Sequence, residues 1–475
     1  MSQSHLFTFK ENLSEPEQQE LERAVNLINI PEVERYFKNA TQNSSNQAEL
    51  DQTQLAPIDH NRTNANATDN QRKLWRDTGL QKIKEGKVGV LLLAGGQGTR
   101  LGSSLPKGCL SVGSASGKCL FQIQFERIQR MQILSGGENM IPLYIMTSPA
   151  TFEATNKALI ENNFFGLEKT QVKIFNQGLL PCFNFDGQIY LKNKSSIATA
   201  PDGNGGLWKA LRVNGIIDDM KNKNLESIHM YCVDNVLTKV ANPEFLGFCL
   251  DKNADCAASC VEKTQPHEAV GVVCSYQNKA RVVEYSEIDK SLAEMKDDKD
   301  DSKLAFRAGN ICNHYFTVSF IEKVSSEEWE DKLVHHVAKK KIPTIDLKTG
   351  EAIKPETSNG IKLEKFVFDV FQFSENFALF NRERAEEFSP LKNNLQAKSD
   401  NARTASSHLH KLHHNWVLKN GGKFAKAEAN QVADNLDYSV EGYPFAVEIS
   451  PLTSYEGEGL KGLCEGKVFN LPLNL

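Results

Sequence analysis

The stretch from Leu91 to Gly102 reads LLLAGGQGTRLG, and Pro106-Lys107 follows it closely. It begins inside a continuous apolar run, residues 88–94, whose length is typical of a strand buried on both faces of a sheet. The run ends in three glycines within four residues, and glycines let backbone N–H groups come close to phosphate oxygens. Because Arg100 and Lys107 then supply positive charge for a polyphosphate, the stretch predicts a phosphate-binding loop.

Three other interpretations of these glycines fit less well. A P-loop is excluded because no Gly-Lys-Ser/Thr follows, and the segment 113–119 is one residue short and ends in Cys. A dinucleotide fingerprint is poor because Gly96, Gly98 and Gly102 spell GxGxxxG, with no clear strand-end acid about 20 residues on. A purely structural turn accounts for the glycines but not for the cations that follow them.

The composition is that of a soluble globular protein. Of 475 residues, 40% are hydrophobic and 24% are charged, which excludes extended disordered, collagenous or coiled-coil chains. The formal net charge of -5 supports neither a nucleic acid nor an anionic membrane as partner. No apolar stretch approaches the roughly 18 residues of a membrane span. The ten cysteines include no CxxC pair, so we expect reduced cysteines and a cytoplasmic protein.

The length suggests about three domains. We expect a helical N-terminal region with a polar linker (1–75), a central catalytic domain (76–398) and a small C-terminal α+β domain (399–475). In the first region, residues 14–28 predict a helix with a capping box of Ser14 and Glu17, and residues 41–70 predict an exposed polar loop or linker. Short β-like runs at 445–449 and 468–471 indicate the last domain.

Apolar runs and helical patterns alternate through the central region, which favours β and α elements around a largely parallel sheet. The candidate strands are 88–94, 143–147, 172–175, 228–233, 269–274 and 281–285, and a helix is predicted around 120–128. The acidic residues 297–301 predict a solvated loop between strands. Four histidines between His408 and His414 predict a solvated helix face rather than a metal site.

LLLAGGQGTRLG with the following PKG closely resembles the signature of eukaryotic UDP-N-acetylglucosamine (UDP-N-acetylhexosamine) pyrophosphorylases, and Gln97 is the variant typical of that group. The resemblance spans roughly residues 80–395 and extends through Glu448-Ile-Ser-Pro-Leu and Tyr455-Glu-Gly-Glu-Gly-Leu. It is weak before residue 70. It implies a Rossmann-like nucleotidyltransferase (GT-A-like) central domain with a mixed, mostly parallel sheet, plus helical N-terminal and small β-containing C-terminal domains.

The resemblance also implies residue roles. Pro201-Asp-Gly-Asn-Gly-Gly206 is by itself a turn-rich loop, but in the family this segment and one matching Gln177–Pro181 contact the nucleotide and sugar. Asp234 follows an apolar run at a probable strand end, where a carboxylate suits Mg²⁺ or serves only as a helix cap; the family's Val-Asp-Asn motif favours Mg²⁺. The implied nucleotide contacts are Leu93, Ala94, Gly95, Gly96, Gln177 and Gly203.

The residues that match the family's sugar pocket are Asn204, Gly271, Glu284, Tyr285, Asn310, Phe366 and Phe368. A carboxylate and an amide suit directional hydrogen bonds to sugar hydroxyls. Residues 365–369 alternate like a strand, so the two phenylalanines are predicted to face the same side, either as core residues or as a pocket wall. Lys392 matches a family lysine that reaches the sugar-side phosphate.

The implied reaction joins N-acetylglucosamine 1-phosphate to UTP, giving UDP-N-acetylglucosamine and pyrophosphate with Mg²⁺, as in amino-sugar biosynthesis. The attacking phosphate is already anionic, so alignment and charge neutralisation suffice; Arg100, Lys107 and Lys392 are the expected catalytic cations. The alternatives are a pyrophosphorylase for UDP-glucose or broad UDP-sugars, a non-catalytic nucleotide-sugar sensor and a nicotinamide dehydrogenase. Self-association is left open.

Overall fold

The computed structural model describes residues 3–45, 51–430 and 443–475. The chain forms two compact units, each assembled from three stretches. The first comprises Met1–Gln54, Gln177–Val213 and Val324–Val370; the second comprises Leu55–Asn176, Asn214–Lys323 and Phe371–Leu475. The division into three consecutive regions after residues 75 and 398 follows different lines from these units, and it stays a prediction.

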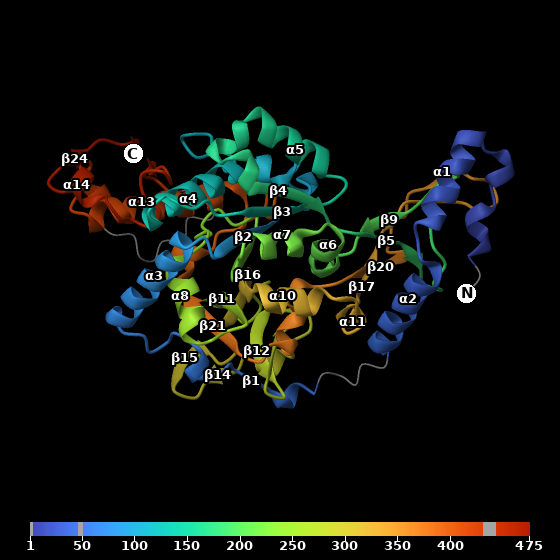
Figure 1. Cartoon of the computed structure of the whole chain (residues 1–475), viewed down its shortest axis with the longest axis horizontal. Helices are drawn as coiled ribbons and strands as arrows, with labels where there is room; N and C mark the ends of the chain where they lie inside the picture. The colour runs from blue at the N-terminus through green and yellow to red at the C-terminus, as the bar shows by residue number, and fades with distance from the viewer. Residues whose placement is uncertain (1–2, 46–50, 431–442) are drawn as a thin grey trace. The chain divides into compact units, whose positions relative to one another are not determined.

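A ten-stranded sheet forms the centre of the second unit (Figure 1). Its main path runs β1-β12-β16-β10-β2-β3-β4, with β11 and β21 joined beside β16 and β13 beside β12. Strands β10, β2, β3 and β4 pair in parallel, as do β11 and β21, whereas β16 is antiparallel to β10, β11 and β12. The sheet is therefore mixed, and the α/β prediction is confirmed.

The strands of this sheet are β1 (Leu55–Ala56), β2 (Val88–Leu93), β3 (Leu143–Thr147), β4 (Val172–Asn176), β10 (Ser227–Cys232), β11 (Cys256–Glu262), β12 (Val272–Tyr276), β13 (Lys279–Val283), β16 (Ala308–Thr317) and β21 (Phe377–Arg382). All six residues of β2 are buried, as its continuous apolar run predicted. The hydrophobic core that β2 belongs to also includes Phe121 and Phe125 of α4 (Leu120–Ser135). Helix α3 (Asp69–Lys84) packs against α8 (Pro243–Asp251).

The C-terminal segment shares this core. Leu409 and Val417 of α13 (Ala402–Lys419) belong to the same buried cluster as Val90 of β2. The predicted β-like runs contain β23 (Val447–Glu448) and β24 (Val468–Phe469), which pair in parallel with β25 (Leu473–Asn474) and β22 (Lys423–Phe424) respectively. Residues 431–442 of the predicted domain lie outside the described residues.

Residues 51–65 depart from the exposed linker predicted from their polar composition. Leu55–Ala56 pairs with β12 in the sheet, Arg62 Nε donates to the carbonyl of Phe377 at 2.8 Å, and the Asn64 amide bonds with the backbone of Asn381 in both directions. The predicted exposure holds for most of these residues, but Leu55, Thr63 and Asn64 are buried because the segment pairs with β12 and its polar side chains satisfy the backbone of β21. Residues 46–50 of the predicted linker lie outside the described residues. The acidic residues 297–301 form the turn region of a hairpin, β14 (Lys296–Asp297) with β15 (Asp300–Leu304).

The first unit has its own smaller core. Helix α1 (Glu15–Asn26) begins with the predicted capping box, in which the backbone N–H of Ser14 donates to Glu17. Helices α1 and α2 (Ile30–Ser45) share a buried cluster with a three-stranded antiparallel sheet, whose order is β17-β20-β6. These strands are β6 (Phe183–Asn184), β17 (His336–Lys340) and β20 (Gly360–Glu364). In the same unit, β5 (Leu179–Pro181) pairs with β9 (Thr199–Pro201).

The remaining helices are α5 (Phe152–Glu161), α6 (Leu207–Val213), α7 (Ile216–Asn222), α9 (Lys290–Ala293), α10 (Val318–Ser325), α11 (Glu327–Glu330), α12 (Arg384–Glu387) and α14 (Lys461–Cys464). Four short strands, β7 (Leu191–Asn193), β8 (Ser196–Ile197), β18 (Thr344–Ile345) and β19 (Ala352–Ile353), form two hairpin-like pairs. In the described part of the chain, no helix is both long and apolar enough to cross a membrane.

Candidate active site

The glycine loop leaves β2 at Leu93 and is held in shape by its own backbone. The N–H of Lys107 donates to the carbonyl of Gly96 at 3.3 Å, and the N–H of Gly98 donates to the carbonyl of Leu105 at 3.1 Å. The N–H groups of residues 95, 96 and 97 donate to no described residue. Three consecutive N–H groups without internal partners provide an anion cradle.

Two of the predicted nucleotide contacts also use one backbone group each inside the sheet. The carbonyl of Leu93 accepts from Val233 at 3.1 Å, and the N–H of Ala94 donates to Met146 at 2.8 Å. Both side chains are buried. Leu93 and Ala94 therefore anchor the start of the loop, while Gly95 and Gly96 carry the N–H groups that remain open.

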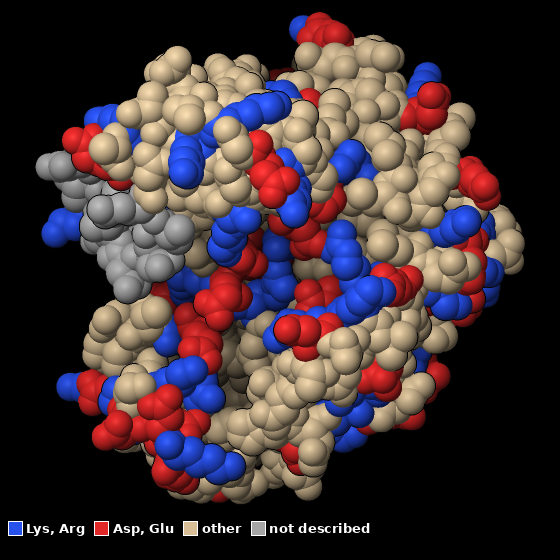
Figure 2. Space-filling view, turned by 90° about the vertical axis from the view of Figure 1, so that its left-hand side faces the viewer, with Lys and Arg blue, Asp and Glu red and all other residues tan. Residues whose placement is uncertain are grey.

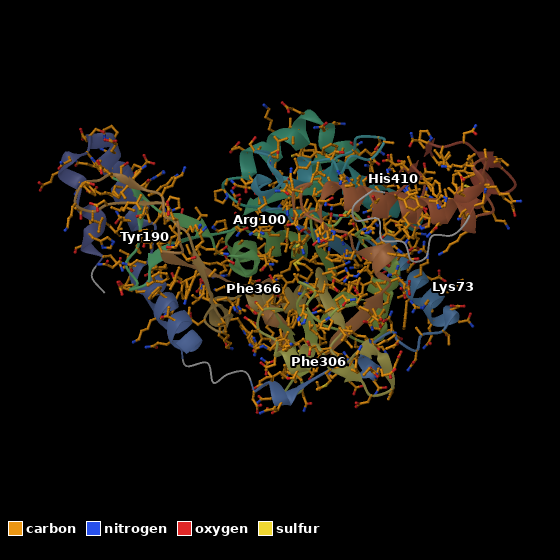
Figure 3. The ribbon with its side chains drawn as sticks, turned by 180° about the vertical axis from the view of Figure 1, so that it is seen from behind. Lys73, Arg100, Tyr190, Phe306, Phe366 and His410 are labelled. Carbon is orange, nitrogen blue, oxygen red and sulfur yellow. The ribbon has the colours of Figure 1, made fainter. Side chains whose placement is uncertain are left out.

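Two predicted catalytic cations lie on this loop. Arg100, labelled in Figure 3, is exposed on the short turn Thr99–Leu101 and forms no ion pair with a described residue. Lys107 Nζ lies 3.7 Å from Asp234 Oδ2, and each side chain is about one-fifth exposed (18% and 19%). A Cβ placed on Gly96 would lie 4.0 Å from Cε of Lys107, so the lysine stem passes beside the glycine loop. The loop, Lys107 and Asp234 thus converge.

Asp234 lies two residues after the end of β10 and also holds the segment that carries Lys392. Its carbonyl accepts the N–H of Leu391 at 2.8 Å, and the N–H of Lys392 donates to the carbonyl of Asp400 at 2.7 Å. Burial raises the pKa of the Asp400 carboxyl, Lys392 opposes that shift and Asp234 adds to it. The structure therefore brings Lys107, Asp234 and Lys392 together, with Asp400 as a second carboxylate that sequence reasoning missed.

Asn235 is a further residue that the sequence analysis passed over. Its buried amide donates to the carbonyl of Glu387 at 2.7 Å and accepts from the N–H of Ser389 at 2.9 Å. Glu387 is itself buried and also accepts from the Asn313 amide at 2.8 Å. Asn235 thus joins the end of β10 to the segment that leads to Lys392. The signals in the sequence were its place after Asp234 near a strand end and in the Val-Asp-Asn motif.

A second group of predicted residues converges at the ends of β12, β13 and β16. The N–H of Asn310 donates to the carbonyl of Gly271 at 2.8 Å, and its side-chain oxygen lies 3.0 Å from Nε2 of His314. A Cβ on Gly271 would lie 2.8 Å from a carboxylate oxygen of Glu284, so only glycine leaves that carboxylate its place. Tyr285 is half exposed. Carboxylate, amide and phenol groups gather here, as a sugar pocket requires.

The other predicted contacts belong to the first unit. Gln177 Nε2 donates to Asp202 Oδ1 at 3.2 Å and to the carbonyl of Gly203 at 3.1 Å. The side-chain oxygen of Asn204 accepts the N–H of Val367 at 2.9 Å, which ties the glycine-rich loop to the residues after β20. The loop and the phenylalanine pair therefore form one local assembly in that unit.

The predicted strand at 365–369 is wrong. Strand β20 ends at Glu364, and Val367–Phe373 is a 3-10 helix. The helix forms because the carboxylate of Asp369 accepts the N–H of Phe366 at 3.2 Å and also lies 3.0 Å from Nε2 of His336. The rings of Phe366 and Phe368 are nevertheless stacked, with centroids 5.2 Å apart, so their expected placement on one side is confirmed.

The histidines of α13 are not a solvated face, so that prediction is wrong. His410, labelled in Figure 3, is buried with Nδ1 at 2.8 Å from the carbonyl of Val447. His413 accepts the N–H of Ile449, and His414 Nε2 lies 2.7 Å from the carbonyl of Ala429. These backbone partners make burial of the rings tolerable. Among the residues that the structure describes, no three or more His, Cys, Asp or Glu side chains form a metal-ligand cluster.

Figure 2 shows basic and acidic side chains interspersed on one face rather than gathered into a single basic patch. Many lysine and arginine side chains of the described residues form ion pairs, as Lys239 does with Glu386 and Arg130 with Glu458. At the glycine loop, Arg100 is exposed and forms no ion pair with a described residue, while Lys107 faces Asp234. An anionic ligand would therefore be bound by local groups and not by the field of the whole protein.

Comparison with known proteins agrees with this geometry. Residues 31–434 match the family model described as UTP–glucose-1-phosphate uridylyltransferase. The chain is 44% identical over 475 residues to UDP-N-acetylhexosamine pyrophosphorylase-like protein 1 of Xenopus tropicalis (98% of this chain, 92% of that protein). It is 40% identical over 480 residues to UDP-N-acetylglucosamine pyrophosphorylase of Saccharomyces cerevisiae (98% and 96%).

A solved structure supports the same assignment. The crystal structure of a UDP-N-acetylglucosamine pyrophosphorylase from Entamoeba histolytica superimposes with a TM-score of 0.78 at 33% identity, covering 89% of this chain and all of that one. The nucleotidyltransferase fold expected from the sequence is thereby confirmed. By sequence and by fold, the chain belongs to the UDP-N-acetylhexosamine pyrophosphorylases within the UTP–glucose-1-phosphate uridylyltransferase family.

Proposed function

We propose that this protein transfers uridylate from UTP to N-acetylglucosamine 1-phosphate, forming UDP-N-acetylglucosamine and pyrophosphate reversibly. The observation that carries the proposal is the convergence of Lys107, Asp234 and Lys392 beside a loop whose N–H groups at residues 95–97 donate to no described residue. The relatives named for this activity support the choice of sugar.

In this proposal, the protein catalyses the reaction by aligning the two substrates and neutralising the charge of their phosphates. The sugar phosphate is already anionic near neutral pH, so no general base is needed. The 95–97 N–H groups hold nucleotide phosphates, Arg100 and Lys107 stabilise the departing pyrophosphate, and Lys392 positions the attacking phosphate. Gln177 and Gly203 contact the uracil. The sugar contacts are Asn204, Gly271, Glu284, Tyr285, Asn310, Phe366 and Phe368.

Mg²⁺ is part of the proposal. Asp234 offers a hard carboxylate oxygen, with the Asp400 carboxyl close enough to interact with it electrostatically. One or two protein carboxylates are what Mg²⁺ takes when phosphates and water supply the rest. These residues therefore fit the ion, and Asp234 would hold it. When bound, Mg²⁺ neutralises charge on the phosphate oxygens.

Replacing Arg100 tests the catalytic assignment. Because a single preorganised charge stabiliser contributes about 10²–10³-fold to turnover, Arg100→Ala should lower kcat by that factor, measured as pyrophosphate release at saturating UTP. Lys73→Ala is the matched control, since Lys73 is an exposed cation on α3 that pairs with Asp77. Near-normal turnover by Arg100→Ala would remove its role.

The runner-up is a pyrophosphorylase for UDP-glucose or for several UDP-sugars, which the broader family model permits. Pyrophosphate release with N-acetylglucosamine 1-phosphate should greatly exceed that with glucose 1-phosphate. Activity with glucose 1-phosphate alone would defeat the sugar assignment while leaving uridylyl transfer intact.

A further inference from the structure

The carboxylate of Asp202 and the amide of Gln177 form a buried pair in the first unit. Gln177 Nε2 donates to Asp202 Oδ1 at 3.2 Å and to the Gly203 carbonyl at 3.1 Å. Both partners are acceptors, so the group of Gln177 that faces them must be its NH₂. The amide oxygen Oε1 therefore points the other way, and no described residue donates to it.

Asp202 is held rigidly enough to impose this orientation. Its side chain is buried between two glycines: a Cβ on Gly178 would lie 2.7 Å from Oδ2, and one on Gly206 would overlap Oδ1. Its backbone N–H donates to Gly178 at 3.2 Å, and its carbonyl accepts from Lys365 at 2.8 Å. Because Gly178 and Gly206 have no side chains, the Asp202 carboxylate fits between them in one position.

The surroundings of Asp202 decide its charge. Asp202 lines a cavity of about 40 Å³, large enough for water, together with Lys365, Lys209 on α6, Glu330 on α11, Tyr36 on α2 and His335 before β17. Burial raises the pKa of Asp202 to about 6, although the Gln177 hydrogen bond and then Lys365 and Lys209 favour the ionised form. The carboxylate is therefore ionised at neutral pH and becomes protonated in mild acid.

The orientation of Gln177 has a consequence for base recognition. Uracil presents a donor at N3 flanked by carbonyl acceptors, whereas cytosine presents an acceptor at N3 beside an amino donor. A glutamine whose NH₂ is committed elsewhere offers only its oxygen, which accepts from uracil N3–H and faces the lone pair of cytosine N3 unfavourably. The adjacent N–H of Gly203, which donates to no described residue, is the matching donor for a uracil carbonyl.

We infer that Asp202, together with the Gly203 carbonyl, makes this enzyme specific for uracil over cytosine nucleotides by holding the Gln177 amide in one orientation. The inference rests on the proposed function, because it takes Gln177 to contact the base. Asp202 is a positioning residue: it acts through Gln177 and touches no reacting atom. A site built to hydrogen-bond one partner rejects an analogue that leaves those groups unpaired.

Asp202→Asn tests the inference at the residue itself. An asparagine at 202 can present its NH₂ to Gln177, so only the Gly203 carbonyl still favours the original orientation of the Gln177 amide. We expect the ratio of kcat/KM for UTP to that for CTP to fall by about 10–100-fold, with kcat for UTP at saturation changed by less than about threefold. Asp186→Asn, at an exposed position in the same unit, should leave the ratio unchanged. An unchanged ratio in Asp202→Asn overturns the inference.

The wild-type enzyme provides a second test that does not depend on the variant folding. A protonated Asp202 can donate to Gln177 Oε1 and turn the amide, so UTP preference over CTP should fall as pH drops from 7 to 6. The range stops at pH 6 because cytosine N3 itself gains a proton in stronger acid and would then donate like uracil N3–H. Substrate phosphates also titrate near pH 6, but they do so equally for both nucleotides and cancel in the ratio. A ratio that is flat with pH overturns the inference. Absence of any UTP-dependent pyrophosphate release would instead overturn the proposed function.

Discussion

Within the glycine loop, Gly96 and Gly98 have different surroundings although only one residue separates them. A Cβ on Gly98 would lie 2.8 Å from the carbonyl oxygen of Leu105 and 3.2 Å from Cβ of Ser103. A Cβ on Gly96 would meet nothing nearer than Cε of Lys107, at 4.0 Å. Gly98 is therefore needed for packing within the loop, while Gly96 leaves open the surface over which the free N–H groups lie.

Alanine at each position should separate the two roles. Gly98→Ala overpacks the loop and should lower stability by about 1–3 kcal/mol, seen as a lower melting temperature. Gly96→Ala should melt like the wild type but raise KM for UTP by about tenfold or more, because its methyl group lies where phosphate oxygens would approach the backbone. An unchanged KM for UTP in a well-folded Gly96→Ala variant would show that phosphate does not contact this loop.

At the scale of elements, the segment that carries Lys392 is fastened to the end of β10. The N–H of Val236 donates to the carbonyl of Ser389 at 3.2 Å, and the amide of Asn235 makes three further bonds, to Glu387, Ser389 and Leu237. These bonds are made by groups that are buried. Asp234 and Lys392 thus come together because these hydrogen bonds join two segments that lie more than 150 residues apart in the sequence.

Asn235→Ala should remove the three side-chain hydrogen bonds of Asn235 and weaken the link between the two segments. Leaving buried donors and acceptors unsatisfied costs about 1–3 kcal/mol each, so we expect a clear loss of stability in urea unfolding. Because these bonds hold the segment that carries Lys392, KM for the sugar phosphate should rise more than KM for UTP. Asn394→Ala, at an exposed asparagine two residues after Lys392, is the control and should change neither. Equal effects on both KM values would count against the positioning of Lys392.

The elements also show what a sequence can and cannot predict. The run at 88–94 has one physical solution, a buried strand, and it was predicted correctly. The alternation of Phe366 and Phe368 fits either a strand or a tight helical turn, and the carboxylate of Asp369 decides for the turn. The buried histidines of α13 depend on carbonyls and N–H groups at 429, 447 and 449. Such partners are set by tertiary structure and leave no local pattern.

For the candidate site, the same limit holds. The loop, Asp234 and Lys392 were found through motifs, and the structure gathers them. Asp202, Asn235 and Asp400 were missed as contributors because each acts through a contact with a residue whose proximity the sequence does not reveal. Their residue types, an acid or amide beside glycines or at a strand end, are equally common in ordinary turns.

Across the whole molecule, buried neutral histidines occur in both units. Burial lowers the pKa of His229 to about 4, that of His314 to about 3 and that of His335 to about 3. In His229 the neutral form is also required by geometry, since Nδ1 accepts the N–H of Ala241 at 2.9 Å while Nε2 faces the amide oxygen of Asn313. Protonation would need Nδ1 to lose that bond.

The native state should therefore lose stability as pH falls through the ordinary histidine range. Below pH 6.5, His229 becomes protonated in the unfolded chain, but in the folded chain it stays neutral down to about pH 4. The free energy of unfolding therefore decreases as pH falls through that window. For His229 alone the loss is on the order of 3 kcal/mol when complete. Carboxyl groups whose pKa burial raises, among them Asp202 and Asp400, oppose this loss because they favour the folded state on acidification. His413 and His414, whose pKa values burial also lowers, add to it.

Urea unfolding at pH 7, 6 and 5 measures this loss. His229→Gln should have a lower stability at pH 7 but a shallower decline toward pH 5, because the glutamine takes up no proton on unfolding. His267→Gln is the matched control: His267 is 70% exposed, so its removal should leave the slope as in the wild type. If His229→Gln declines as steeply as the wild type, the acid sensitivity must come from other groups, since a histidine that titrates equally in both states contributes nothing to the slope.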